Sequence, residues 1–159
     1  MADPTPQAAA PAAAAPQNTY TDPYRAYNFK MDILGVTEAH FTEISNMEIK
    51  VNPIAYREGG NSQVVHYVPG YVEYGTVTLR YGLTKSRELW DWFMKGVSGK
   101  VERKHISIVL LDADGTTQVM QWNLIDAWPT HWRGSMLNAL SQEVAIESLT
   151  LVCESINRD

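Results

Sequence analysis

Hydrophobic and polar residues alternate with a period of two along several short stretches of the chain. The stretches 29–33, 47–51 and 77–81 each place apolar residues at every second position, and Gly35 and Pro53 follow the first two. Successive side chains of a strand point to opposite faces, so each stretch predicts a β-strand with one buried and one polar face.

Three more strands are predicted in the second half of the chain. Residues 106–111 and 119–125 read as a hairpin, because Asp114-Gly115 between them can supply the positive φ angles of a tight turn. A last strand is expected over about 143–153. Its apolar phase shifts along the way, which predicts a β-bulge near Glu147-Ser148.

The section 51–70 interrupts this regular pattern. The run Glu58-Gly59-Gly60-Asn61-Ser62 predicts a long flexible connection between strands. A short strand is possible over 64–68, and Pro69-Gly70 is typical of a turn.

One helix is predicted from about Lys85 to Val97, where apolar residues recur at helical spacing. Thr84 or Ser86 can cap its start, Glu88 suits the first turn, and Gly99 lies just beyond its end. Its apolar stripe consists of Leu89, Trp90, Phe93, Met94 and Val97.

Together these elements predict a mostly β fold. We expect an antiparallel β-barrel or sandwich of about seven strands with one flanking α-helix that covers an opening. The expected core residues are Leu79, Trp90, Phe93, Ile108 and Trp122.

Composition divides the chain into two parts. Residues 1–22 are an extension of alanine and proline that we expect to be flexible, because proline blocks a continuous helix. Residues 23–159 are long enough for one domain with a sizeable core.

Charged residues make up only 19% of the chain, a hint that partners cover much of its surface. The formal net charge of -5 argues against a general nucleic-acid binder.

Neither a catalytic constellation nor a metal site emerges from the residues. The four histidines, including His40, show no metal-ligand spacing. Asp112-Ala113-Asp114-Gly115 resembles the start of a calcium loop, but its glycine comes two residues early. Cys153, in an apolar run, is expected to be a buried thiol. We therefore expect no cofactor, no metal and no enzymatic activity.

The sequence also bears on location. No apolar run approaches the roughly 18 residues needed to cross a bilayer, and the N-terminus lacks the pattern of a signal peptide. We expect a protein that is made in the cytoplasm, stays soluble there and has no direct membrane anchor.

Several motifs, in order along the chain, resemble one known family. They are the segment 56–61 (YREGGN), Val68-Pro69-Gly70, 78–82 (TLRYG), Leu89-Trp90-Asp91-Trp92, the hairpin, 122–129 (WNLIDAWP) and 145–149 (AIESL). From about Tyr24 to Asn157 the chain thereby resembles the inner tail-tube proteins of contractile-tailed phages and contractile injection systems. It is more distantly similar to the tube protein of type VI secretion.

The resemblance implies a structural subunit. Six copies would form a ring, and rings would stack into a hollow tube inside a contractile sheath. The implied partners are further copies of the chain, the sheath protein, the baseplate hub and spike, and a tube-terminating cap. The lumen would hold a protein toxin, or DNA in a true phage tail, and we favour the injection system. The particle would be assembled in the bacterial cytoplasm and become an extracellular or cell-associated phage tail-like structure.

Two sets of site residues follow. The long, glycine-rich and charged section 52–63 is the candidate contact between rings, through Asn52, Pro53, Tyr56, Arg57, Glu58, Gly59, Gly60, Asn61 and Ser62. The candidate lumen-facing residues are polar strand positions, which could equally be ordinary outer-surface positions: Glu48, Lys50, Thr76, Thr78 and Arg80.

Two other functions remain open at this point. The chain could be a monomeric small-ligand-binding β-barrel whose aromatic residues line a pocket. It could also be a small hydrolase that uses His66, His105 or His131.

Overall fold

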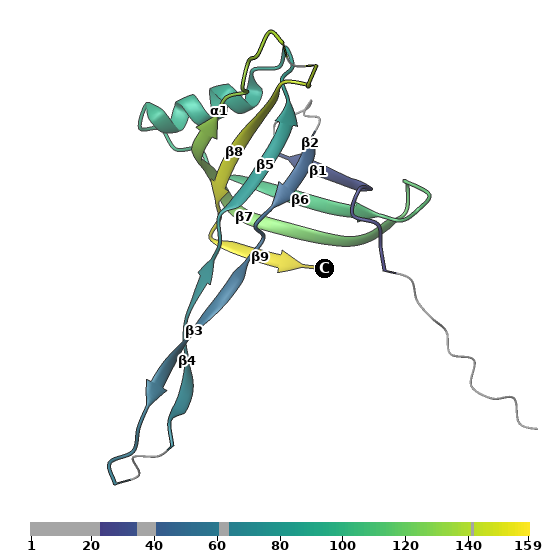
Figure 1. Cartoon of the computed structure of the whole chain (residues 1–159). Helices are drawn as coiled ribbons and strands as arrows, with labels where there is room; N and C mark the ends of the chain where they lie inside the picture. The colour runs from purple at the N-terminus through teal and green to yellow at the C-terminus, as the bar shows by residue number, and fades with distance from the viewer. Residues whose placement is uncertain (1–22, 35–40, 61–63, 141) are drawn as a thin grey trace, which may run out of the picture.

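The computed structural model describes residues 23–34, 41–60, 64–140 and 142–159. It contains nine strands and one helix (Figure 1). The strands are β1 (Phe29–Ile33), β2 (Phe41–Ser45), β3 (Ile49–Tyr56), β4 (His66–Tyr74), β5 (Val77–Gly82), β6 (Lys104–Leu111), β7 (Gln118–Arg133), β8 (Ile146–Val152) and β9 (Ser155–Arg158). The helix is α1 (Glu88–Val97).

Seven of the strands form one antiparallel sheet. Its order is β1-β6-β7-β8-β5-β2, and β9 pairs with β7 on the edge opposite β6. This confirms the predicted mostly β fold with about seven strands and one helix. Among the described residues, the remaining strands, β3 and β4, pair only with each other, in a separate two-stranded ladder.

The sheet is divided by the long strand β7. Residues 118–127 of β7 pair with β6 and β9, whereas residues 128–133 pair with β8. Between these parts Asp126 has a φ of 53°. We call the first group half A (β1, β6, residues 118–127 of β7, and β9) and the second group half B (residues 128–133 of β7, β8, β5 and β2).

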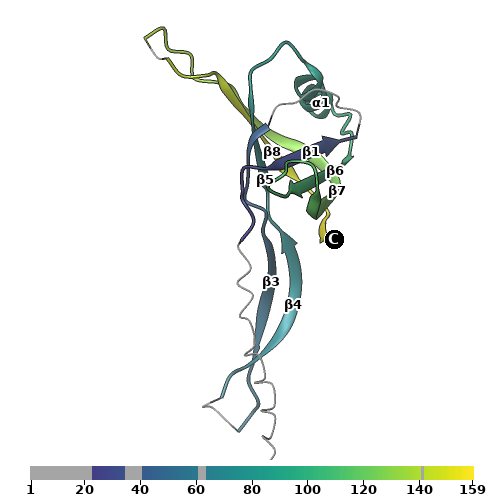
Figure 2. The same ribbon diagram turned by 90° about the vertical axis from the view of Figure 1, so that its right-hand side faces the viewer.

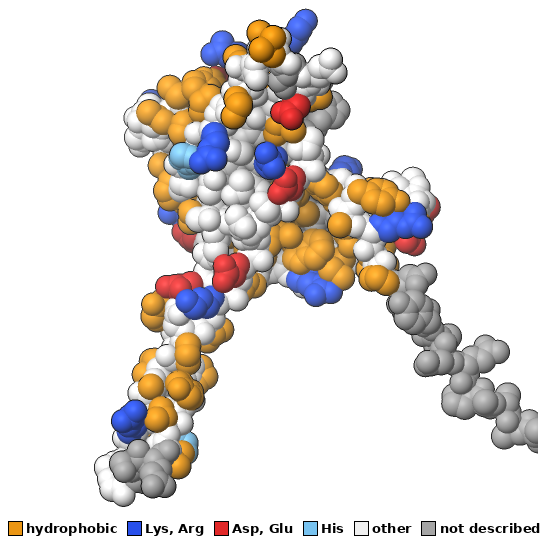
Figure 3. All heavy atoms as spheres, in the orientation of Figure 1, with side chains coloured by type: hydrophobic (Ala, Val, Ile, Leu, Met, Phe, Trp, Pro, Cys, Tyr) orange, Lys and Arg blue, Asp and Glu red, His pale blue; other side chains and the backbone are white. Residues whose placement is uncertain are grey.

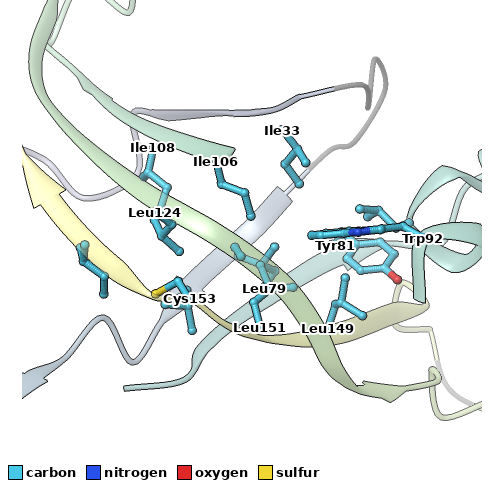
Figure 4. Close-up of a cluster of buried hydrophobic side chains, with 14 residues drawn as sticks. Ile33, Leu79, Tyr81, Trp92, Ile106, Ile108, Leu124, Leu149, Leu151 and Cys153 are labelled. Carbon is cyan, nitrogen blue, oxygen red and sulfur yellow. The ribbon is translucent and has the colours of Figure 1, made fainter. Parts of the chain in front are cut away.

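The hydrophobic core lies between the two halves (Figure 4). Half A contributes Ile33, Ile106 and Leu124, which face Leu79 and Leu149 of half B. Each of these side chains is at most 2% exposed. Burying one such side chain stabilises the fold by about 1.5–3 kcal/mol, so this core is the main source of stability.

The core prediction is confirmed in part. Leu79 and Ile108 are buried, while Phe93 and Trp122 are partly buried against the core. Trp90 lies outside the fully buried set and packs edge-on against Trp132, with ring centroids 4.7 Å apart.

The helix α1 begins later than predicted, at Glu88, and no side chain caps its start. Its buried residues are Leu89 and Trp92, whereas Met94 and Val97 of the predicted stripe are exposed. The Trp92 Nε1–H donates to the Glu102 carbonyl oxygen at 2.7 Å, which turns the indole toward the body.

Gly99, predicted just beyond the helix end, has a φ of 81° there. The Lys100 amide donates to the Lys95 carbonyl oxygen across this turn. A left-handed residue at this position is a common way to end a helix, because it lets late amides reach the last free carbonyls.

The prediction for 51–70 is right in part: the strand expected over 64–68 corresponds to the start of β4, but the connection is shorter than predicted, because β3 continues to Tyr56 and β4 begins at His66. The ladder continues through Pro53, because a bulge between Val51 and Pro53 absorbs a register shift. Pro69 pairs with Pro53 inside β4, so Pro69-Gly70 is part of a strand and not a turn. Paired strands thus occupy both ends of the section that was predicted to be irregular.

Two smaller features also differ from expectation. The β5–β8 ladder runs without a shift from Gly82↔Ile146 to Val77↔Leu151, so β8 has no bulge at Glu147-Ser148. The irregularity lies instead in β7, between Pro129 and His131.

The hairpin between β6 and β7 is confirmed. Its connection is wider than a two-residue turn, since the Asp112 amide donates to the Thr117 carbonyl oxygen. The Asp114 carboxylate accepts bonds from the hydroxyl and amide of Thr117 and from Thr116, and these bonds lower the pKa of Asp114 well below its usual range. The Asp114 carboxylate therefore stabilises the connection of the hairpin through these hydrogen bonds.

Candidate functional site: arm, polar face and open edges

The ladder of β3 and β4 projects from the body as a long arm (Figures 1 and 2). Apolar side chains cover its surface in the space-filling view (Figure 3). Eight large apolar side chains of the two strands are between 48% and 69% exposed: Ile49, Val51, Ile54, Tyr56, Tyr67, Val68, Tyr71 and Val72. Such a continuous exposed apolar surface is typical of a protein–protein contact.

The arm has little support from the rest of the chain. An isolated two-stranded hairpin is marginally stable in water. Charges are few, and the strand pairing sets Lys50 across from Glu73. The arm therefore gains stability when another surface covers its apolar side chains.

Close backbone contact fixes the bulge in the arm. A Cβ at Gly70 would lie 2.4 Å from the Asn52 carbonyl oxygen and 3.0 Å from Cγ1 of Ile54. Only glycine leaves room for the two strands at this point. The close approach of the two strands at the bulge thus depends on Gly70.

Those predicted contact residues between rings that the structure describes lie in β3 or directly after it. Asn52, Pro53 and Tyr56 lie in β3, and residues 57–60 follow β3 toward its tip. Asn61 and Ser62 lie outside the described residues. Part of the predicted loop is therefore strand, and its role as a contact between rings stays a prediction.

Half B carries a polar face on the side opposite the core. Two cross-strand rows build it, one through Glu43, Arg80, Ser148 and Arg133, the other through Ser45, Thr78, Thr150 and His131. Arg80 Nη1 lies 3.0 Å from Glu43 Oε2. The face therefore carries four hydroxyl side chains, one ion pair, a second arginine (Arg133) and His131.

The five predicted lumen-facing residues divide into two groups. Thr78 and Arg80 lie on the polar face of half B. Glu48 and Lys50 lie at the base of the arm, and exposed Thr76 immediately precedes β5. The structure therefore brings together only two of the five.

Sequence reasoning missed most of the polar face. The missed residues lie on β2, β8 and the end of β7, and they are Glu43, Ser45, Ser148, Thr150, His131 and Arg133. In β8 the alternation of Ser148 and Thr150 with two leucines was a usable signal. In β2 the register shifts between Phe41 and Glu43, so the alternation is broken there.

Half B has two open lateral edges. Within the described residues, β2 pairs only with β5, and residues 128–133 of β7 pair only with β8. Exposed strand edges normally pair with another chain or are blocked by charge or a bulge. These two edges are places where further strands can join the sheet.

An apolar hollow of about 420 Å³ opens at the seam between half A and β2. Its lining includes Phe29, Ile44, Met47, Ile108 and Trp122. The hollow lies where the strand order ends, at β1 on one side and β2 on the other.

The residues considered for catalysis lie apart from one another in the fold. His66 is in the arm, His105 in β6 of half A, and His131 in β7 of half B, while His40 lies outside the described residues. Among the residues that the structure describes, no three His, Cys, Asp or Glu side chains come together to hold a metal ion.

Cys153 is a free, buried thiol. Burial raises the pKa of its thiol, which disfavours the nucleophilic thiolate.

In the described part of the chain, no helix has the length and apolar character needed to cross a membrane.

Comparison with known proteins decides the family. The model of the T4-like virus tail tube protein gp19 family matches residues 25–157. The chain belongs to this tail-tube family. No curated protein sequence matches it at a significant level.

Solved structures agree with this membership. A chain of the extracellular contractile injection system PVC sheath–tube complex in its extended state is 29% identical, with a TM-score of 0.78, over 86% of this chain and 91% of that one. A chain of the anti-feeding prophage tube terminating cap is 26% identical, with a TM-score of 0.77, over 89% and 93%. The tail-tube resemblance seen in the sequence is confirmed.

The tail-tube fold also extends to more distant proteins. Hcp1 from Flavobacterium johnsoniae is 13% identical, with a TM-score of 0.53, over 82% of this chain and 93% of that one. At this identity the likeness is one of fold alone.

Proposed function

We propose that this tail-tube protein is the structural subunit of the inner tube of a phage-like contractile injection system. Hexameric rings of the chain stack into a hollow tube, and contraction of a surrounding sheath drives the tube through a target envelope. The observation that carries this proposal is the pair of open edges on half B, together with the polar face between them.

The strand directions of half B support a closed ring. All neighbours in the order β7-β8-β5-β2 are antiparallel, so β7 and β2 run in opposite directions. Placing β2 of one copy beside residues 128–133 of β7 in the next continues the alternation. Every copy then pairs both edges, which removes the hazard of open strand edges.

The polar face would become the wall of the lumen. Residues of one sheet face stay on one side when sheets join edge to edge, so Thr78 and Arg80 would line the channel with their row neighbours. Glu48, Lys50 and Thr76 would lie at its margin, near the base of the arm. Such a wall would be polar, with hydroxyl groups, the Arg80–Glu43 ion pair, Arg133 and His131 facing the cargo.

The arm would join one ring to the next. Its exposed apolar side chains need a partner, and it extends beyond the body on one side (Figure 2). Head-to-tail contacts of this kind do not close on themselves and so produce filaments.

The remaining partners follow from the same proposal. The relatives come from a sheath–tube complex, a baseplate and a tube-terminating cap, which supports contacts with sheath, baseplate hub and spike, and cap proteins. The cargo would be a protein toxin, or DNA in a phage tail. The subunit needs no cofactor or catalytic site and no membrane anchor. It would assemble in the bacterial cytoplasm into an extracellular or cell-associated particle, with residues 1–22 as an extension of the tube domain.

Electron microscopy of the purified protein tests the proposal. Negative stain should show rings or tubes of uniform width. The double variant Tyr67→Ser/Tyr71→Ser should remain folded but stop tube growth, because both side chains are at least 66% exposed in the free subunit. Val97→Ser on α1, 63% exposed, is the matched control and should assemble normally. A wild-type protein that stays monomeric at high concentration, with and without baseplate partners, would refute the proposal.

The seam hollow supports a second candidate, a monomeric ligand-binding barrel. This function predicts that an apolar dye binds the free subunit with one-to-one stoichiometry and shifts the fluorescence of Trp122. Replacement of Phe29 by Ser should abolish that binding. A dye that binds equally well to the Phe29→Ser variant would exclude the hollow as a ligand site.

A further inference from the structure

The connection between β7 and β8 carries a second exposed apolar patch. Met136, Leu137, Leu140 and Val144 are 89%, 81%, 93% and 78% exposed. Large apolar side chains are rarely so exposed when several lie within a few residues of one another. We call these four residues the end patch.

The end patch lies at the opposite end of the molecule from the arm. The arm points downward in both ribbon views, and the connection between β7 and β8 lies at the upper end in both (Figures 1 and 2). A subunit therefore presents one apolar surface at each end along this direction.

The chemistry of the end patch matches that of the arm. Met136, Leu137 and Val144 line an open hollow of about 500 Å³, together with Asn138, Ala139, Glu143 and Ala145. Residues 135–140 contain no charged side chain. Because most of the lining is apolar or uncharged, an apolar hairpin can cover this hollow while desolvating few polar groups; Glu143 is the one charged residue among those that line it.

We infer that the end patch is the seat for the arm of a second copy of this chain. The inference rests on the proposed function and deepens it: the arm of a subunit in one ring lies on the end patch of a subunit in the adjacent ring. Both surfaces lose their exposure to water in the same contact.

The length of the arm, and the fact that the contact can repeat from copy to copy, favour the arm of a second copy as the occupant of the end patch. Strands of eight and nine residues span about 30 Å, so the arm extends far enough beyond the body to meet another subunit end to end. Joining two different surfaces at opposite ends leaves each new subunit with one free arm and one free end patch. Growth can therefore continue by the same contact.

Site-specific photo-crosslinking tests the seat directly. A photoreactive phenylalanine analogue at Leu140 is activated in tubes assembled from an equal mixture of heavy- and light-isotope subunits. Mass spectrometry should find mixed-isotope crosslinks to residues 49–56 or 66–74. The same probe at Val97 on α1 is the control and should give none to the arm.

Several outcomes are informative about this contact. Tubes that form while the Leu140 probe crosslinks only to its own chain or to another surface would overturn the inference and leave the proposed function intact. Crosslinks from Leu140 that appear only after sheath protein is added would assign the end patch to the sheath and also overturn it. Wild-type protein that forms neither rings nor tubes would instead refute the proposed function.

A measurement on the unmodified protein covers the case in which the probe blocks assembly. Amide hydrogen exchange is compared between tubes and dispersed subunits. Residues 134–140 and both arm strands should gain protection together, and unchanged exchange over 134–140 in tubes would overturn the inference. In addition, Leu140→Ser should raise the critical concentration for tube growth by roughly tenfold or more, the effect of losing one buried leucine contact.

Discussion

The bulge in the arm gives the sharpest prediction from this structure, through the substitution Gly70→Ala. The new Cβ would lie 2.4 Å from the Asn52 carbonyl oxygen, which is part of the backbone and cannot swing away. It would also touch the Ile54 side chain at 3.0 Å. One of the two strands must therefore shift.

The cost can be estimated from known overpacking effects. Inserting a methyl group into a tight contact costs about 1–3 kcal/mol, which lowers the ratio of paired to unpaired arm by roughly 5- to 150-fold. The arm is a two-stranded ladder with marginal stability of its own. We therefore expect Gly70→Ala to open or distort the arm while the body of the protein remains folded.

Two measurements separate these effects. Amide exchange over 49–56 and 66–74 should accelerate in Gly70→Ala, and sedimentation should show fewer assembled tubes. The thermal unfolding of the body should change little, because the core lies between halves A and B and not in the arm.

Gly82→Ala is the matched control, since Gly82 also lies in a strand and a Cβ there meets nothing within 4 Å. This variant should leave arm exchange and assembly unchanged. If Gly70→Ala assembles as well as Gly82→Ala and its arm exchanges at the wild-type rate, the reasoning about the close backbone contact is wrong.

Three further predictions concern the body. Leu79→Ala should lower the free energy of unfolding by about 2–5 kcal/mol in urea denaturation, because Leu79 is fully buried; a loss under about 1 kcal/mol would contradict its place in the core. Arg80→Ala should cost no more than about 1 kcal/mol in the same assay, since the side chains of Arg80 and Glu43 are 50% and 49% exposed. Burial, and then the charge of Glu147, raises the pKa of Tyr81 far above its usual value of 10.0. The unfolded chain loses this proton from about pH 10 while the folded chain keeps it, so stability should fall as the pH rises above about 10. Tyr81→Phe should reduce this fall between about pH 9 and 11, and an identical slope in both proteins would refute it.

The sequence predicted the body of the fold well where alternation and burial agree. In β5, for example, Val77, Leu79 and Tyr81 are buried and Thr78 and Arg80 are not, as the period of two requires. The hairpin of β6 and β7 was equally readable from its turn residues. The family resemblance then followed from the order of these motifs.

Sequence rules that consider one chain alone could not predict the arm, because the apolar side chains of the arm are not buried within that chain. Ile49 and Val51 alternate with polar residues as in a half-buried strand, yet both are more than half exposed in the subunit. Pro53, Pro69 and Gly70 indicated breaks in the strands, whereas a bulge and one close backbone contact accommodate them in the paired strands. Apolar periodicity reports burial in the final assembly, and only a partner can supply that burial here.

The polar face was out of reach for a different reason. Its rows come from four strands that are distant in the sequence, so membership depends on pairing register. Thr78 and Arg80 were found because β5 alternates cleanly. Glu43 and Ser45 were missed because the register shift in β2 hides the strand.

The continuous backbone of β7 has a mechanical consequence. Its first ten residues belong to half A and its last six to half B, so the peptide chain itself crosses from one layer to the other at Asp126. A force that pushes on one layer along the direction of travel is transmitted to the other through covalent bonds, and slippage between layers would require breaking the ladder of a central strand. A subunit built this way can be pushed forward as one rigid body, because half A and half B share the load.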